Sequence, residues 1–258
     1  MSRSILWHHF SRPIPYSSGL QLQENLHRLQ LERRRVNNNH PDILLLLEHR
    51  PVYTTGRRQS QAALDDERRR LIQYGAEWVP SNRGGETTYH GPGQLVGYPL
   101  FDLRRFEVCL SVKDYVCLLQ RTLKSFAELH GVRTVDSEHT GAFVSDTEKL
   151  GSIGVQVRHR LTTHGISINI TEEPIPWFNE VVACGLPSVN AVSLSGRKGE
   201  HITIDQSVSG VLDRVQHLFK VNALPLSDHA DAAILELITQ AEQQAVLAGP
   251  WPSLPLKT

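Results

Sequence analysis

The chain has 258 residues and a mass of 29.0 kDa, with 40% hydrophobic and 21% charged residues, so it can bury a core without disulfides or metal ions. Lys plus Arg and Asp plus Glu number 27 each, and this balance excludes a dedicated nucleic-acid binder. The longest apolar run, Ile43–Leu47, is far shorter than the ~20 residues of a membrane-spanning helix. We therefore expect a globular protein whose partners include neither nucleic acid nor a membrane.

The first half of the chain is expected to alternate helices and strands. Leucines recur at helical spacing through Ser18–Val36, which predicts an amphipathic helix. The continuous apolar run Ile43–Leu47 is typical of a strand that is buried on both faces. The further expected segments are a short helix at Asp65–Tyr74, a strand at Glu77–Val79 and an apolar segment at Leu95–Leu100.

The second half begins with the clearest helix, Leu110–Leu129, whose apolar residues form one stripe and which ends before Gly131. Short strands are predicted at Ala142–Ser145, Ser152–Arg158 and Gly165–Ile170, and helices at Pro174–Val182, Asp205–Phe219 and Asp231–Leu247. The proline-rich end from Gly249 is expected to be frayed. The fold class that follows is α/β, with one domain at 1–225 and a C-terminal helical appendage with a proline-rich tail at 226–258.

Unusual residues are densest in Arg83-Gly-Gly-Glu-Thr-Thr-Tyr-His-Gly-Pro-Gly-Gln94. Its four glycines allow the backbone to approach a ligand closely. The segment is not a P-loop, because no Gly-Lys-Ser/Thr ends it, and the dinucleotide-binding glycine spacing also fails. Structural turns are the commoner origin of glycine clusters, but an arginine, a tyrosine and a histidine in the same loop favour a ligand contact.

Two shorter segments carry a lysine and a histidine next to predicted strands. In Lys149-Leu-Gly-Ser-Ile-Gly154 the lysine stands just ahead of an apolar strand, and in Thr163-His164-Gly165 the histidine opens the next one. Taken alone, each of these residues fits a structural role. The thirteen histidines of the chain show no zinc-ligand spacing, so no metal site is expected.

The three cysteines are too few and too scattered for a disulfide framework and are typical of a reducing compartment. Cys109 and Cys117 stand beside or within the predicted helix Leu110–Leu129, and we expect both to be buried and inert. Cys184 ends an apolar run and precedes Gly185, where the chain turns out of the core. Its thiol is therefore predicted to be reachable and held in position.

Together these segments resemble the octanoyltransferases of lipoate biosynthesis, also called lipoyl(octanoyl) transferases or octanoyl-acyl-carrier-protein:protein N-octanoyltransferases. The segments that carry the resemblance, in matching order and spacing, are Arg83-Gly-Gly85, Thr88–Gln94, Lys149–Gly154, His164-Gly165 and Cys184-Gly185, and Glu48–Gly56 also looks like a family stretch. The chain departs at Ala183, where the family usually has proline, and at Gly151, where alanine or cysteine is usual. The resemblance implies a single mixed-sheet α/β domain like that of the biotin and lipoate ligases.

The activity implied by the resemblance is that of an acyltransferase, which moves an octanoyl group from acyl carrier protein to a specific lysine of a lipoyl domain, the first step of endogenous protein lipoylation. Cys184 would carry the octanoyl group as a thioester, and Lys149 would stabilise its thiolate and then accept the proton of the attacking lysine. The implied substrate-binding residues are Arg83, Gly84, Gly85, Glu86, Thr87, Thr88, Tyr89, His90, Ser152, Ile153, Gly154, His164, Gly165, Ile166 and Ser167. No cofactor is expected, because the thioester is already activated.

The implied partners are octanoyl-acyl carrier protein as donor and lipoyl domains as acceptors, namely those of 2-oxoacid dehydrogenase E2 subunits and the glycine cleavage H protein. The amino-acid sequence of several segments is closer to that of eukaryotic members, which implies a mitochondrial location. A bacterial source would imply the cytoplasm.

Three other functions stay open at the level of the sequence. An ATP-dependent lipoate–protein ligase of the same fold would adenylate a free acid and would not need Cys184. A non-catalytic binder of lipoyl domains or of the acyl carrier would have no use for both Lys149 and Cys184. A thiol hydrolase would release free octanoate even when an acceptor is present.

Overall fold

The computed structural model describes residues 3–57, 61–106, 109–181 and 189–256, so Cys184 and Gly185 lie outside the described residues. Its main sheet is mixed, with β1 parallel to β2 and β11, and β6 antiparallel to both β2 and β9. In spatial order the strands are β10 (Asn190–Ala191), β8 (Glu148–Arg158), β9 (Leu161–Asn169), β6 (Gln94–Leu100), β2 (Ile43–Leu47), β1 (Arg3–His9) and β11 (Val221–Pro225), and β7 (Ala142–Ser145) also pairs with β8. A smaller sheet contains β4 (Glu77–Pro80), β3 (Val52–Thr55) and β5 (Thr88–His90).

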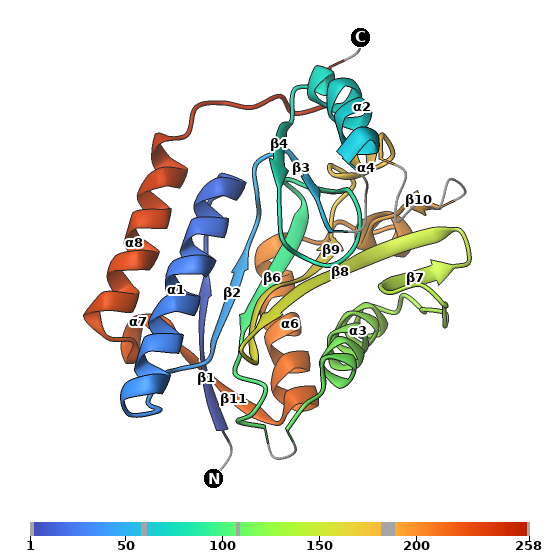
Figure 1. Cartoon of the computed structure of the whole chain (residues 1–258). Helices are drawn as coiled ribbons and strands as arrows, with labels where there is room; N and C mark the ends of the chain where they lie inside the picture. Colours follow the sequence, from blue (N-terminus) through green and yellow to red (C-terminus); the bar gives the residue numbers. More distant parts are fainter. Residues whose placement is uncertain (1–2, 58–60, 107–108, 182–188, 257–258) are drawn as a thin grey trace.

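Helices cover both faces of the main sheet (Figure 1). On one face α1 (Tyr16–Val36) lies beside α8 (Ala232–Leu247), and on the other α3 (Val112–Leu129) lies beside α6 (Ile204–Phe219). The shorter helices are α2 (Gln61–Leu71), the 3₁₀ turn η1 (Ile72–Tyr74), α4 (Ile175–Phe178), α5 (Leu194–Lys198) and α7 (Leu226–His229). This is the mixed α/β arrangement expected from the sequence.

Strand β2 explains why its sequence is an uninterrupted apolar run. Leu45 and Leu47 pack into the apolar cluster under α1 and α8, whereas Leu44 and Leu46 pack into the cluster under α3 and α6. Successive side chains of a strand point to opposite faces, so a central strand with helices on both faces buries every residue. The sheet therefore separates two apolar cores.

Two strands begin earlier than the sequence predicts. β8 starts at Glu148 and β9 at Leu161, so Lys149 and His164 lie within strands and not ahead of them. The pairing of β7 and β10 with the first residues of β8 extends that strand. Such pairing joins segments that are distant in sequence, and local residue patterns do not record it.

The C-terminal end of the chain is bound to the rest of the structure, and the prediction that it is frayed is wrong. The Leu256 amide donates a hydrogen bond to the carbonyl of Tyr74 at 3.0 Å. The Arg50 guanidinium donates to the Pro250 carbonyl at 3.1 Å and lies 5.3 Å from the Trp251 ring centroid. These contacts are made to residues some 200 positions earlier.

Helix α8 shares the apolar cluster of α1 and β2 through Ile234 and Ile238. The expected boundary between 225 and 226 falls where β11 ends and α7 begins. The division of the chain into a catalytic part and an appendage at this point stays a prediction.

The turn between β8 and β9 is made by His159 and Arg160, whose φ angles are 53° and 68°. A two-residue hairpin turn of this hand needs both residues in the left-handed region, where a β-carbon is unfavourable and glycine is preferred. The turn therefore carries local backbone strain.

We expect Arg160→Gly to have a free energy of unfolding about 1 kcal/mol higher than that of Arg160→Ala, because glycine relieves the strain and alanine keeps the β-carbon. Both variants lose the 3.2 Å hydrogen bond from Arg160 to the Leu110 carbonyl, so their comparison isolates the backbone effect. Urea denaturation measures the difference, and equal midpoints in the two variants would contradict the prediction.

Candidate active site

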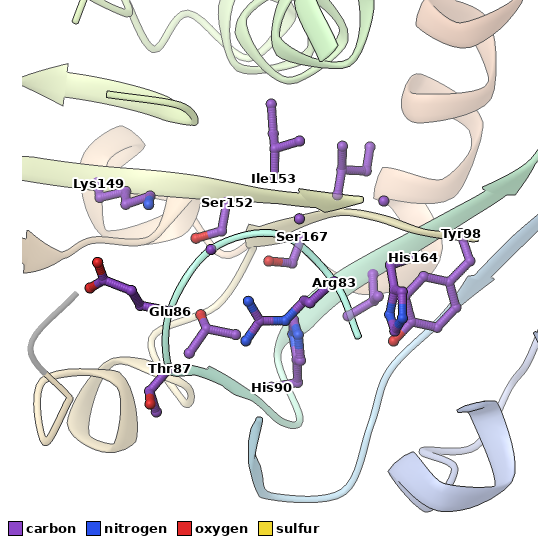
Figure 2. A pocket seen from close by; sticks show the side chains of 16 residues that line it. Arg83, Glu86, Thr87, His90, Tyr98, Lys149, Ser152, Ile153, His164 and Ser167 are labelled. Atoms are coloured by element: carbon purple, nitrogen blue, oxygen red, sulfur yellow. The ribbon is translucent and has the colours of Figure 1, made fainter. Parts of the chain in front are cut away.

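A cavity opens between the main sheet and the loop that leads into β5, which passes in front of β8 and β9 (Figure 2). It is lined by Arg83, Gly85, Glu86, Thr87, Thr88, His90, Val96, Tyr98, Lys149, Ser152, Ile153, Gly154, His164, Gly165, Ile166 and Ser167. The structure thus brings together the three motif segments that the sequence singled out. Of the predicted substrate-binding residues, all line the cavity except Gly84 and Tyr89, and their role in binding stays a prediction.

Gly84 and Tyr89 hold the loop in place from outside the cavity. The Gly84 amide donates a hydrogen bond to the Val155 carbonyl at 2.9 Å, which docks the loop on the edge of β8. The Tyr89 ring is fully buried and stacks on Trp177, with ring centroids 5.6 Å apart. Both residues therefore shape the loop and do not face the cavity.

Arg83 connects the loop to the smaller sheet. Its Nη2 donates to the carbonyl oxygen of Thr54 at 2.6 Å and to the Oγ1 of the same residue at 2.9 Å. Its aliphatic stem passes over Gly154, where an added β-carbon would lie 2.9 Å from Arg83 Cδ and 3.2 Å from the Gly84 carbonyl oxygen. Glycine at 154 is thus required by the close approach of the loop to β8.

Two histidines face the cavity in the uncharged form. Burial lowers the pKa of His164 to about 3, and the nearby Arg83 acts in the same direction. Burial also holds the pKa of His90 well below its usual value. His90 donates its Nδ1–H to Oε1 of Gln94 at 2.6 Å, and Nε2 of Gln94 donates to Oδ1 of Asn169 at 2.8 Å. These two hydrogen bonds fix the His90 ring with Nε2 as its unprotonated nitrogen.

Lys149 lies at the start of β8, at the same end of the cavity as Glu86 (Figure 2). Its side chain is nearly inaccessible, with 3% exposure, and its Nζ is 5.4 Å from the centroid of the Phe143 ring. β10, the first described strand after residue 188, pairs in parallel with the start of β8, with Ala191 beside Lys149. Cys184 itself lies outside the described residues.

The other two cysteines are exposed, so the prediction that they are buried is wrong. Helix α3 buries Tyr115 and Leu119, and Cys117 stands midway between them in sequence. Two residues turn an α-helix by about 200°, so Cys117 points away from the buried side. Neither Cys109 nor Cys117 lines the cavity.

Sequence reasoning missed Val96 and Tyr98, which line the cavity from β6. Every residue of β6 is buried, so its composition gives no sign that one face meets a cavity. The strand period of two would have placed Val96 and Tyr98 on the same face, opposite Leu95. That signal existed, but it could be used only once the neighbours of β6 were known.

Comparisons with known proteins identify the family of the chain. Residues 15–216 match the family described as the lipoyl protein ligase A/B catalytic domain. The chain is 36% identical to the mitochondrial octanoyl-[acyl-carrier-protein]:protein N-octanoyltransferase of Danio rerio, over 80% of this chain and 88% of that protein. It is 40% identical to an octanoyltransferase of Desulfotalea psychrophila, over 69% of this chain and 79% of that protein.

A solved structure of the bipartite lipoate protein ligase of Thermoplasma acidophilum superposes with a TM-score of 0.67, over 100% of this chain and 98% of the other, at 12% identity. At that identity the likeness shows the fold, which is the lipoate ligase-like fold expected from the sequence. The chain belongs to the lipoyl protein ligase A/B catalytic-domain family. Within that family it is an octanoyltransferase, an enzyme of the acyltransferase class.

The contact at Gly154 can be tested without an activity assay. We expect Gly154→Ala to lower the free energy of unfolding by about 1–3 kcal/mol, because the added methyl group must push Arg83 and the Gly84 carbonyl away from β8. Gly249→Ala is the control, since its β-carbon meets no heavy atom within 4 Å, and its effect should stay within about 0.5 kcal/mol. Similar urea midpoints for wild type and Gly154→Ala would show that the contact is not tight.

Proposed function

We propose that the chain transfers an octanoyl group from octanoyl-acyl carrier protein to a lysine of a lipoyl domain, with Cys184 as the nucleophile that carries the group. The observation that carries the proposal is the burial of Lys149 in the wall of the cavity. Arg83 and His90 line the same cavity. The names of the relatives supply the chemistry of the donor, an octanoyl group on an acyl carrier protein, and of the acceptor, a protein amine.

In the first half-reaction the Cys184 sulfur attacks the carbonyl carbon of the donor thioester. A new carbon–sulfur bond forms and the bond to the thiol of the carrier breaks. The proton of Cys184, held by Lys149 while the thiolate attacks, passes to the departing thiolate and leaves Lys149 neutral. The thiolate is the reactive form of a cysteine, and a nearby ammonium favours it. Lys149 supplies that charge, and its neighbour Ala191 lies on the first described strand after the Cys184 segment.

In the second half-reaction the ε-amine of the acceptor lysine attacks the carbonyl carbon of the acyl-enzyme. An amide bond forms, the bond to Cys184 breaks, and the amine loses a proton that Lys149 accepts in its neutral form. His90 and His164 stay uncharged at neutral pH because burial lowers the pKa of both. The cavity thus presents neutral imidazoles to the acyl chain, and in this scheme the proton is exchanged at Lys149.

For the partners, we propose the lipoyl domains of 2-oxoacid dehydrogenase E2 subunits and the glycine cleavage H protein as acceptors. For the location we propose the mitochondrion, or the cytoplasm if the source is a bacterium. The relatives from Danio rerio and Arabidopsis thaliana carry the word mitochondrial in their names, and those from bacteria do not.

The nucleophile can be identified by intact mass spectrometry after incubation with octanoyl-acyl carrier protein in the absence of ATP. We expect the wild type and Cys117→Ser to gain one octanoyl group, because Cys117 does not line the cavity. Cys184→Ser should gain none and should lose about 10³-fold or more in transfer, because a serine hydroxyl is a far weaker nucleophile than a thiolate.

Three outcomes would overturn this scheme. An octanoyl group on Cys184→Ser would exclude Cys184 as the acyl carrier. A requirement for ATP would favour a ligase, and release of free octanoate in the presence of an acceptor would favour a hydrolase.

The two roles of Lys149 make separate demands on its side chain. Lys149→Arg keeps a cation, so acylation of Cys184 should be largely retained. Arginine stays protonated and cannot accept the proton of the acceptor amine, so transfer to the lipoyl domain should fall by about 10²-fold or more. Lys149→Ala should be slow in both half-reactions. Single-turnover measurements separate the two steps, and equal impairment of both in Lys149→Arg would leave Lys149 as an electrostatic partner only.

A further inference from the structure

His164 has an irregular backbone conformation for a residue inside a strand. It belongs to β9, yet its φ angle is 58°, in the left-handed region that residues with a β-carbon rarely adopt. The hydrogen-bonded ladder between β9 and β6 is interrupted after the pair Gly97–Ile166. In the same register His164 would stand opposite Pro99, which has no amide hydrogen to continue the ladder. The irregular conformation therefore occurs where the ladder stops.

The left-handed conformation turns the His164 side chain to the other face of the sheet. Two residues further along the strand, Ile166 packs into the apolar cluster under α3 and α6. Val155, which pairs with His164 on β8, packs against the same cluster. Regular alternation along β9 would place His164 on that face as well. Instead its ring lies 6.2 Å, between centroids, from the ring of Tyr98, which belongs to the cluster under α1 and α8 (Figure 2).

A glutamine of α1 holds this conformation. The amide of His164 donates a hydrogen bond to Oε1 of Gln23 at 2.6 Å, and Gln23 is fully buried and does not line the cavity. Tyr98, against which the His164 ring lies, is also fixed, because its hydroxyl donates to Nε2 of His49 at 2.6 Å. Nδ1–H of His49 donates to the carbonyl of Ile14 at 3.1 Å, which leaves Nε2 to accept. The ring thus lies between a backbone held by α1 and a tyrosine that is fixed in place.

The ring nitrogens of His164 are available to a ligand. The residue is 2% exposed and lines the cavity, and among the residues that the structure describes none bonds to its Nδ1 or Nε2. Burial lowers the pKa of His164 to about 3, so the imidazole is neutral and offers one N–H donor and one acceptor nitrogen. Buried polar groups are nearly always hydrogen-bonded, and backbone strain is concentrated at functional sites. Both observations point to a polar group of a bound substrate as the partner of this ring.

We infer that Gln23 is a positioning residue of the proposed octanoyl transfer, because it holds the left-handed backbone of His164 and thereby keeps the imidazole in the cavity. There the imidazole offers its hydrogen bonds to a polar group of a bound substrate. The inference rests on the proposed function, but it concerns the wall of the cavity and needs no particular position of the acyl chain. Without the Gln23 acceptor the amide of His164 loses its hydrogen bond inside the protein, and the strained backbone is expected to relax.

The first test compares two buried glutamines of α1. Gln23→Met keeps the size of the side chain but removes the acceptor, so kcat/KM for transfer from octanoyl-acyl carrier protein to a lipoyl domain should fall by about 10-fold. Gln30→Met is the matched control, because Gln30 is also buried but donates to the carbonyls of Pro41 and Leu100, which do not line the cavity. Its kcat/KM should stay within about 2-fold of the wild-type value.

The second test shows whether Gln23 acts through His164. In the wild type and in Gln30→Met a nuclear Overhauser effect should connect the rings of His164 and Tyr98, and in Gln23→Met it should be lost. His164→Gly removes the imidazole and tolerates the left-handed backbone. Adding Gln23→Met to His164→Gly should therefore lower kcat/KM by no more than about 2-fold, whereas independent roles would repeat the full loss.

The outcomes separate the inference from the function on which it rests. Absence of octanoyl transfer by the wild type would overturn the proposed function, whereas the contact between the two rings is measured without substrate. If the wild type transfers octanoate, an unchanged kcat/KM in Gln23→Met would overturn the inference, and so would a ring contact that survives the substitution. A full loss on adding Gln23→Met to His164→Gly would show that Gln23 acts independently of the imidazole. Should Gln23→Met fail to fold, Gln23→Asn, whose amide is one methylene too short to reach, gives the same comparison, and a wild-type kcat/KM there is equally decisive.

Discussion

The hydrogen bonds between Arg83 and Thr54 join the loop that lines the cavity to β3 of the smaller sheet. A guanidinium has five donors in a fixed plane, so it can bond the carbonyl and the hydroxyl of one residue while its stem packs elsewhere. Here the stem passes over Gly154 of β8. Glu86 precedes β5 and His90 ends it, and the positions of both follow from where Arg83 fixes the loop.

Charge in the cavity is divided between two kinds of groups. The histidines that face it are neutral because burial lowers their pKa, whereas the guanidinium of Arg83 is a permanent cation. The positive charge of Arg83 does not vanish as the pH rises through the usual histidine range. Such a site suits the proposed reaction, in which negative charge develops on sulfur and on a carbonyl oxygen.

Local sequence patterns predicted what is local in the structure. The apolar run of β2, the stripe of α3 and the motif around Arg83 were recognisable because each is contained in one segment. The early start of β8 was not, since it depends on pairing with β7 and β10. The contact between Tyr98 and His49 spans 49 positions and was invisible for the same reason. The exposure of Cys117 could have been read from helical geometry alone, but burial was assumed from residue type.

The docking of the C-terminal tail joins residues 250–256 to the segments that lead into the smaller sheet. Its two anchors, Arg50 and Tyr74, stand shortly before β3 and β4, the parallel pair that includes Thr54. The tail therefore contacts the residues that stand just before both strands. Trimming it would loosen the smaller sheet rather than α8, and amide hydrogen exchange in β3 would register that loosening. Residues 250–256 and the smaller sheet thus form one mechanical unit, although 200 positions separate Arg50 from Pro250.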